Sequence, residues 1–245
     1  MIIKIRPSSL SVYATCPRCL WLGHRTKWRE PLNLQLYSVL AAKEENFLHG
    51  KNTTEVVPEL GDGTFRWRGE TIMSAPVTGL DTPHEVFVGG SFDNVAQLVD
   101  GTVAVVDCKT TAGKTEGSIN KYLLQLNAYA YAIENPADHD FVNRAHQDLK
   151  SGQGIGYFQK PTWSERKTVS RIGVKVFSFA GGFGGGGEDY SVSMKGVFQE
   201  GSKDYDALRK RCQWLVDVIT RDHPPMSEAS CSYCRSVSQY QDEVG

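Results

Sequence analysis

Two acidic residues and one lysine have the spacing of a hydrolytic metal site. Asp107 and Lys109 lie two positions apart at the end of an apolar run. Because side chains alternate along a strand, we expect both to project from one face, with Cys108 on the other face as a small core residue. Asp93 lies on the preceding apolar run, and Asp100-Gly101 between the two runs predicts a hairpin. This hairpin would bring Asp93 alongside Asp107.

A divalent cation is the expected partner of these carboxylates. Two carboxylates that converge at a buried strand end repel each other unless a cation lies between them. Ligand sets made only of oxygen atoms favour Mg²⁺ or Mn²⁺. Lys109, next to that metal, would orient the attacking water or stabilise charge growing on a phosphate. Taken alone, Asp-x-Lys is typical of a surface ion pair, so the interpretation depends on the neighbouring motifs.

Polar residues on two expected helices extend this candidate site. Gln125 and Tyr129 are at i and i+4 of the helix expected over 119–134, and they therefore share one helical face. Amphipathic helices with a polar rim carry the same pattern. His49 lies at the end of the helix expected over 32–48. A single histidine is usually structural, although neutral imidazole also binds metals.

The order and spacing of these motifs resemble the PD-(D/E)XK nuclease superfamily, specifically its RecB-like branch. The motifs are Gly90-x-x-Asp93, Asp107-x-Lys109 and Gln125-x-x-x-Tyr129. The resemblance spans residues 9–134 and continues at the C-terminus. It implies an α/β fold, namely a restriction-endonuclease-like core with a mixed central sheet flanked by helices.

The resemblance also implies a role for each residue of the candidate site. The implied metal ligands are His49, Asp93, Asp107 and the carbonyl of Cys108, and the metal is Mg²⁺ or Mn²⁺. Lys109 would assist the nucleophilic water. Gln125 and Tyr129 would position Lys109 or the DNA backbone.

Two Cys-x-x-Cys pairs lie near opposite ends of the chain, Cys16-Pro-Arg-Cys19 and Cys231-Ser-Tyr-Cys234. Each pair presents two thiolates to one centre, so together they would supply four soft ligands to a metal. We expect residues 9–30 and 222–245 to form this Cys₄ metal clamp around a core of residues 32–221, within a single nuclease domain of residues 1–245. The alternative is two unrelated pairs of reduced thiols, or a disulfide.

The segment from Ser9 to Arg18 resembles the start of iron–sulfur nucleases of the RecB-like branch, such as the CRISPR-associated exonuclease family and AddB-type nuclease domains. Those proteins hold a [4Fe–4S] cluster with one N-terminal and three C-terminal cysteines. This sequence differs, because Tyr240 stands where the last cysteine is expected and Cys19 is additional. The resemblance favours [4Fe–4S], and structural Zn²⁺ is the alternative because four thiolates also suit zinc.

Basic residues cluster locally, although the formal net charge of the chain is −1. Phosphates require such charges, and aromatic rings provide stacking platforms for unpaired bases. Each of these residues is equally consistent with an ordinary solvated surface position. The cationic residues are Arg18, Arg25, Lys27, Arg29, Lys114, Lys121, Arg166, Lys167 and Arg171, and the neighbouring aromatic residues are Trp21, Trp28 and Trp163.

Hydrophobic periodicity and turn residues predict the remaining elements of a chain of 245 residues, a length that suits one large domain. Helices are expected over 8–25, 32–48, 119–134 and 202–221, and strands over 2–5, 64–73, 85–98, 102–110, 154–159, 172–179 and 191–198. No apolar run approaches the ~20 residues of a membrane span. The N-terminus lacks the apolar core of a signal peptide. We therefore expect a cytoplasmic protein that does not contact a membrane.

These patterns predict a metal-dependent DNA nuclease, an exonuclease acting on single-stranded DNA or DNA ends. The exonuclease activity is implied by the resemblance, because the spacing alone predicts only a metal site. Within the resemblance, an alternative is a nuclease subunit that trims DNA for a larger machine, with an integrase or a helicase as partner. An alternative of another class is a non-catalytic DNA-binding or scaffold subunit of a CRISPR adaptation or recombination complex. A homo-oligomer is compatible with all of these.

Overall fold

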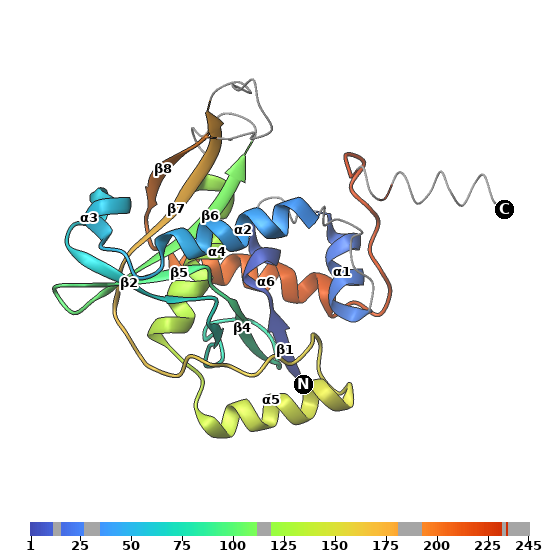
Figure 1. Ribbon diagram of the computed structural model, residues 1–245. Coiled ribbons are helices and arrows are strands. Elements are labelled where there is room, and N and C mark those ends of the chain that lie inside the picture. Colours follow the sequence, from blue (N-terminus) through green and yellow to red (C-terminus); the bar gives the residue numbers. More distant parts are fainter. Residues whose placement is uncertain (12–15, 27–34, 112–118, 181–192, 232–233, 235–245) are drawn as a thin grey trace.

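The fold was analysed in a computed structural model of the chain, which describes residues 1–11, 16–26, 35–111, 119–180, 193–231 and 234 (Figure 1). Several residues of the sequence predictions lie outside the described residues, namely Lys27, Trp28, Arg29, Lys114 and Tyr240. Parts of the predicted clamp segments 9–30 and 222–245 also lie outside them. No helix of the described residues is long and apolar enough to cross a membrane.

Two sheets form the centre of the molecule. The smaller sheet has the order β1-β4-β3, with strands β1 (Ile2–Ile5), β4 (Glu85–Ser91) and β3 (Thr71–Met73). The larger sheet has the order β2-β5-β6-β7-β8, with strands β2 (Gly63–Arg68), β5 (Asn94–Leu98), β6 (Val103–Thr111), β7 (Val169–Ala180) and β8 (Ser193–Gly201). Because β1–β4 and β6–β7 are parallel pairs and the others are antiparallel, both sheets are mixed.

Helices cover both faces of the larger sheet, and the alternation along β6 shows which helix covers which face. Val103 and Val105 belong to the core cluster that includes α4 (Ile119–Glu134). The side chains of Ala104, Val106 and Cys108 project from the other face of β6. They pack with Leu48 of α2 (Gln35–Leu48) in a second cluster. Figure 1 shows α2 crossing the sheet on the side opposite α4. The predicted mixed sheet flanked by helices is therefore confirmed.

The remaining helices lie around this centre. They are α1 (Pro17–Arg25), α3 (Thr53–Val56), α5 (His139–Ser151) and α6 (Tyr205–Ile219), with 3₁₀ turns η1 (Pro7–Leu10) and η2 (Pro58–Leu60). Helix α1 packs against α6, and η1 packs against α4. The N-terminal segment is therefore fixed to helices that come much later in the sequence.

The β5–β6 hairpin has the predicted turn. Thr102 donates its backbone N–H to Asp100 Oδ1 at 2.9 Å, and Gly101 has a φ of +85°, a conformation that favours glycine. The last antiparallel pair of this hairpin is Asn94 with Val106. Residues 107–111 of β6 therefore extend beyond β5 and pair with β7 alone. This open edge of β6 is where the acidic residues lie.

Several predicted elements differ from the structure for local reasons. The predicted helix over 8–25 ends at Arg25 as expected but begins too early, because α1 begins at Pro17, whose missing N–H suits the first helical position. The strand predicted over 64–73 divides at Gly69, where φ is +61°. The strand predicted over 85–98 divides at Phe92 and Asp93. The strand predicted over 154–159 is absent from this described segment, where Ile155 makes an isolated bridge to Ile3.

Helix α5 was not predicted. Its N-cap is Asp138, whose Oδ1 accepts the backbone N–H of Phe141 at 2.7 Å, and its C-cap is Gly152 with a φ of +78°. Only Phe141, Ala145 and Leu149 of this helix are buried. A helix with so narrow an apolar stripe gives a weak periodic signal, although its two caps are clear in the sequence.

Candidate active site and cysteine centre

Asp93, Asp107 and Lys109 meet at the open edge of β6. Asp107 is 1% exposed, and its Oδ2 lies 2.6 Å from Lys109 Nζ. Asp93 Oδ2 lies 4.0 Å from the same ammonium and accepts the backbone N–H of Cys108 at 2.7 Å. Because β5 ends at Asn94, the carboxylate of Asp93 takes the place of a strand partner for Cys108. One cation thus lies between two carboxylates.

Burial and mutual repulsion control the ionisation of this group. Burial raises the pKa of Asp107 to about 7, although the charge of Lys109 lowers it and that of Asp93 raises it further. Burial also acts on Lys109, but the two carboxylates outweigh it and raise the pKa of its ammonium. The Cys108 thiol has a pKa raised well above its usual value by burial in the α2-side cluster. Cys108 is therefore a neutral core side chain, as expected from the alternation.

Helix α4 supplies the hydrogen bonds that hold Asp107. Gln125 Nε2 donates to Asp107 Oδ1 at 3.2 Å and lies 3.4 Å from the hydroxyl oxygen of Tyr129. Tyr129 donates its own hydroxyl to the backbone carbonyl of Ser91 at 2.7 Å. Burial, together with the nearby Asp107 and Asp93, raises the pKa of Tyr129, so that this phenol stays neutral. The chain of contacts from Ser91 to Asp107 fixes one carboxylate oxygen relative to the end of β4.

Helix α2 brings two further carboxylates to the site, which sequence reasoning missed. Glu44 accepts a hydrogen bond from the hydroxyl of Thr110, next to Lys109. Burial raises the pKa of Glu45, and the negative charge of Asp93 raises it further. Burial also raises the pKa of Glu44, to which the charge of Asp93 makes a smaller contribution. The signal available in the sequence was this acidic pair one turn before His49.

His49 itself follows the last residue of α2 and is exposed. Among the described residues, it does not form a group with Asp93 and Asp107 whose ligand atoms all lie within 4.8 Å. Its role as a metal ligand therefore stays a prediction, as does that of the Cys108 carbonyl.

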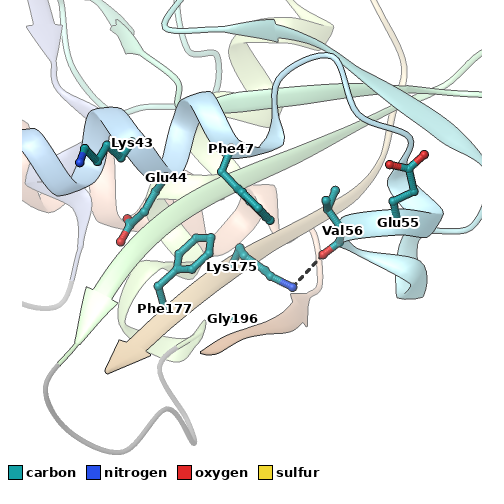
Figure 2. A pocket seen from close by; sticks show the side chains of 8 residues that line it. All are labelled: Lys43, Glu44, Phe47, Glu55, Val56, Lys175, Phe177 and Gly196. Carbon is teal, nitrogen blue, oxygen red and sulfur yellow. Dashed lines mark hydrogen bonds between the residues drawn. The ribbon is translucent and has the colours of Figure 1, made fainter. Parts of the chain in front are cut away.

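A cavity of about 400 Å³ lies beside Glu44 on the α2 side of the sheet (Figure 2). Figure 2 shows Phe47 and Phe177 facing this cavity, with ring centroids 6.3 Å apart and an edge-to-face arrangement. Lys175 Nζ donates to the Val56 carbonyl at 2.8 Å, and burial lowers the pKa of this lysine. Two lysines, Lys43 and Lys175, and two glutamates, Glu44 and Glu55, line the cavity, so it has no excess of positive charge for a phosphate backbone.

The acidic group has the donor set of a divalent-metal site. Oδ2 of Asp107 is buried and receives no hydrogen bond of good geometry from the described residues. The ammonium of Lys109 lies 2.6 Å from this oxygen and also 4.0 Å from Asp93, so one positive charge faces two carboxylates. Carboxylate oxygens from β6 and from the residue before β5 are ligands that Mg²⁺ and Mn²⁺ accept.

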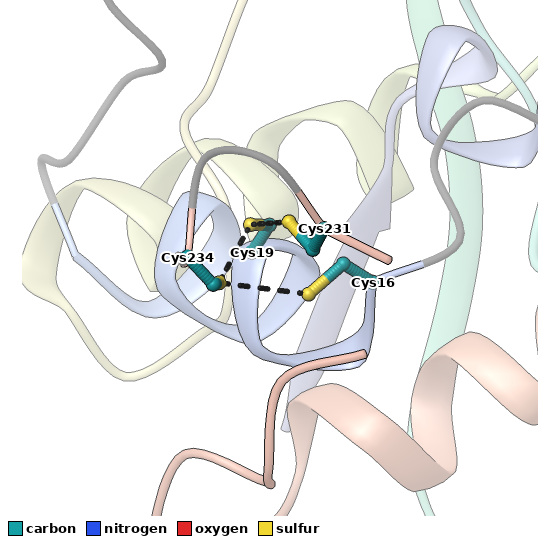
Figure 3. A group of neighbouring side chains, drawn as sticks. All are labelled: Cys16, Cys19, Cys231 and Cys234. Atoms are coloured by element: carbon teal, nitrogen blue, oxygen red, sulfur yellow. Dashed lines mark hydrogen bonds between the residues drawn. The ribbon is translucent and has the colours of Figure 1, made fainter. Parts of the chain in front are cut away.

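The four cysteines of the two Cys-x-x-Cys pairs converge, as predicted (Figure 3). Cys16 is the N-cap of α1 and Cys19 lies one turn later. The sulfur of Cys19 lies 3.5 Å from that of Cys234 and 3.7 Å from that of Cys231, and Cys16 lies 3.7 Å from Cys234. All four sulfurs lie within 4.8 Å of one another, and none forms a disulfide. Figure 3 shows the four side chains directed at one point between α1 and the C-terminal segment.

Backbone hydrogen bonds favour the thiolate form of Cys16, which is the form that binds metals. Burial opposes the ionisation of Cys16, but hydrogen bonds from the backbone N–H groups of Cys19 and Glu228, and then from Cys231, lower its pKa to about 7. Burial raises the pKa of Cys234 to about 11 and also raises that of Cys19. Four thiols this close cannot all ionise without repelling one another. A soft cation that binds thiolates offsets this repulsion.

The expected DNA-contacting residues have different surroundings. Arg171 forms an ion pair with Glu200 at 2.6 Å, and Trp163 is buried in the core, where its indole donates to the Glu165 carbonyl. Trp163 as a stacking platform is therefore wrong, because its ring packs against Trp67 and Phe92. Lys167 forms an ion pair with Glu165, and the Trp21 indole donates to the Arg221 carbonyl. The remaining described cationic residues of the expected set are exposed, namely Arg18, Arg25, Lys121 and Arg166.

Comparison with known proteins decides the family. A model of the PD-(D/E)XK nuclease superfamily matches residues 54–238. The chain belongs to this superfamily. The matched segment contains Asp93, Asp107, Lys109, Gln125 and Tyr129, and it begins after Cys16, Cys19 and His49. Membership in the PD-(D/E)XK superfamily makes the protein a metal-dependent nuclease, and the acidic group at the edge of β6 is its candidate active site.

One solved structure similar to this PD-(D/E)XK chain is described as the crystal structure of SSO0001. It has a TM-score of 0.51 and 12% sequence identity, and the alignment covers 96% of this chain and 84% of that chain. This likeness extends over nearly the whole chain and concerns the fold. A search of curated proteins gave no match.

Proposed function

We propose that this PD-(D/E)XK nuclease is a Mg²⁺- or Mn²⁺-dependent exonuclease that acts on single-stranded DNA or DNA ends. The observation that carries the proposal is the group formed by Asp93, Asp107 and Lys109, in which a lysine ammonium contacts two carboxylates at an open strand edge. A surface ion pair would not need a carboxylate buried to 1% exposure and held by Gln125. The preference for single strands and ends extends the family resemblance.

The residues of the site have separable tasks in phosphodiester hydrolysis. Asp93 and Asp107 would hold the divalent metal, which supplies Lewis-acid activation of water and phosphate. Lys109 places a fixed positive charge where negative charge develops on the phosphate, and it needs no reorganisation because Asp107 already orients it. Gln125 and Tyr129 keep Asp107 in one orientation.

Linear and circular DNA substrates test the proposal. The expected result is that single-stranded linear DNA labelled at one end is shortened progressively with Mg²⁺ or Mn²⁺, while single-stranded circles of the same sequence stay intact. Cleavage of circles at a similar rate would show an endonuclease and would overturn the exonuclease proposal. If neither substrate is cut but both are bound, a non-catalytic DNA-binding subunit is the better account.

For the cysteine centre, the sulfur spacing supports a single tetrahedral ion. Four thiolates at ~2.3 Å from one Zn²⁺ lie ~3.8 Å apart, close to the 3.5 and 3.7 Å separations of three of the six sulfur pairs, and all six are within 4.8 Å. A [4Fe–4S] cluster binds each thiolate through a different iron and spreads the sulfurs more widely. We therefore favour zinc over the iron–sulfur cluster that the resemblance suggested. Iron, sulfide and zinc analysis of protein purified without oxygen tests this choice.

A further inference from the structure

A second, larger groove lies at the N-terminal side of the molecule. Its volume is about 960 Å³, and its walls come from the end of α1, the residue after β1, the last turn of α5 and the residues up to Tyr157 that follow it. Figure 1 shows α1, β1 and the segment after α5 near one another, far from the α3 end of the sheet. The groove is therefore distinct from the smaller cavity beside Glu44.

The charge of the groove is positive. Arg6 and Arg25 line it, and no acidic residue does so among the described residues. His24 also lines it, but burial lowers the pKa of this histidine to about 4, so that the imidazole is neutral near pH 7. In a chain with a formal net charge of −1, a groove whose described charged residues are both arginines favours an anionic ligand.

An exposed aromatic ring stands on the same groove. Tyr157 is 45% exposed, and the ammonium of Lys4 lies 4.5 Å from the centre of its ring. The segment that carries Tyr157 is held to β1, because Ile155 donates to the Ile2 carbonyl and accepts from Lys4, both at 2.9 Å. Gly154 permits this approach, since a Cβ there would lie 2.7 Å from the Ile2 carbonyl oxygen. The ring is thus presented by a fixed backbone.

The chain that continues from Arg6 also contacts the strand that leads to the candidate active site. Pro7, the residue after Arg6, packs so closely on Gly90 that a Cβ at position 90 would lie 3.0 Å from its ring. Asp93 follows Gly90 by three residues, a chain length that spans at most about 10 Å. A strand of nucleic acid bound at the Asp93 end of β4 can therefore continue past Arg6 into the groove.

We propose that this groove binds the single-stranded DNA that leads to the active site. Arg6 and Arg25 contact its phosphates, and Tyr157 stacks on one of its bases. Charge alone would select any anion, but cations combined with an exposed ring on a fixed segment match the alternating phosphates and bases of an unpaired strand. The proposal rests on the proposed function and specifies where the substrate of that nuclease lies.

Binding of two matched strands tests the groove independently of cleavage. One is a short single strand, and the other is an abasic strand of the same length, with every phosphate and no base. In EDTA, Tyr157→Leu should weaken binding of the intact strand about tenfold and leave the abasic strand unaffected, because only stacking is lost. Tyr157→Phe, which keeps the ring, should restore wild-type affinity.

Arg25→Gln should weaken binding of both strands about fivefold and should reduce the slope of log affinity against log salt by about 0.7, the value for one phosphate contact on a single strand. The control is Arg144→Gln on α5, because Arg144 is exposed but already paired with Glu85 at 2.9 Å. This control should bind both strands as the wild type does.

The outcomes separate this proposal from the proposed function. If wild-type protein cleaves DNA but Tyr157→Leu and Arg25→Gln bind like the control, the groove proposal is overturned and the nuclease stands. If these variants lose affinity as stated but wild-type protein cuts no DNA with any metal, the groove stands and the nuclease does not. Failure of wild-type protein to bind either strand would overturn both.

Discussion

At the scale of single residues, substitution of Lys109 tests the proposed chemistry most directly. This lysine lies within 4.0 Å of two carboxylates and 26% of its side chain is exposed, so it is accessible to a phosphate. Lys109→Ala should lower the cleavage rate by about 10²- to 10³-fold, as loss of one charge-stabilising group does. DNA affinity should change little. Single-turnover cleavage and equilibrium binding of the same strand measure the two effects, and Lys210→Ala, at an exposed lysine of α6, is the control. Cleavage by Lys109→Ala at the wild-type rate would show that the active site lies elsewhere.

Asp107 should make the metal-free protein pH-sensitive. Its folded pKa of about 7 lies above the unfolded value near 3.8. The protonated carboxyl therefore stabilises the fold at low pH, and this contribution is lost as pH rises through about 7. In EDTA, the melting temperature of wild-type protein should fall between about pH 4 and pH 7 relative to that of Asp107→Asn, which has no proton to lose, and the difference should level off above about pH 7. Parallel melting curves for the two proteins would contradict the buried carboxylate.

Two candidate metal ligands lie at the C-terminal end of α2, namely His49 and the acidic pair Glu44 and Glu45. The sequence indicated His49, and His49→Ala should then raise the Mg²⁺ concentration required for half-maximal cleavage. Glu44 and Glu45, however, are the α2 side chains whose pKa values respond to Asp93. If Glu45→Gln raises the Mg²⁺ requirement several-fold and His49→Ala does not, the carboxylate is the ligand.

At the scale of elements, the hairpin and α4 were predictable because their signals are local. Asp100-Gly101 determines the turn, and the i, i+4 spacing of Gln125 and Tyr129 determines which helical face meets Asp107. The position of α2 was not predictable in this way. Glu45 and His49 are at i and i+4 and share one face, so which of them reaches the site depends on where α2 ends over the sheet, and packing of Leu48 against the sheet sets that position.

The Cys₄ clamp joins two elements that are separate in sequence, α1 and the segment around Cys231 and Cys234. Cys231→Ser should lower the melting temperature and the soluble yield first, with cleavage lost through unfolding, because metal binding is coupled to folding. A strong chelator should lower the melting temperature of wild-type protein to that of Cys231→Ser and should not change that of the variant. An unchanged melting temperature in Cys231→Ser would show that the cysteines hold no structural metal.

For the whole molecule, length and composition predicted one large domain but gave no sign of the groove that we propose for DNA binding. The net charge of −1 averages over ion pairs such as Arg171 with Glu200 and over the cationic groove at Arg6 and Arg25. Trp163 shows the same limit, since its basic neighbours in the sequence suggested a DNA contact while its ring is a core residue. Tertiary packing determines which charges and rings remain exposed to a ligand. Residue patterns in one sequence do not show that packing.

Metal-dependent hydrolysis of DNA by wild-type protein and Asp107→Asn, compared side by side, tests the central claim most directly. A single-stranded linear DNA labelled at one end would be incubated with each protein in Mg²⁺, in Mn²⁺ and in EDTA. The account predicts labelled products from wild-type protein with either metal, none in EDTA, and none from a folded Asp107→Asn variant under any condition. Products from Asp107→Asn at the wild-type rate, or from wild-type protein in EDTA, would contradict a metal site built on Asp93, Asp107 and Lys109.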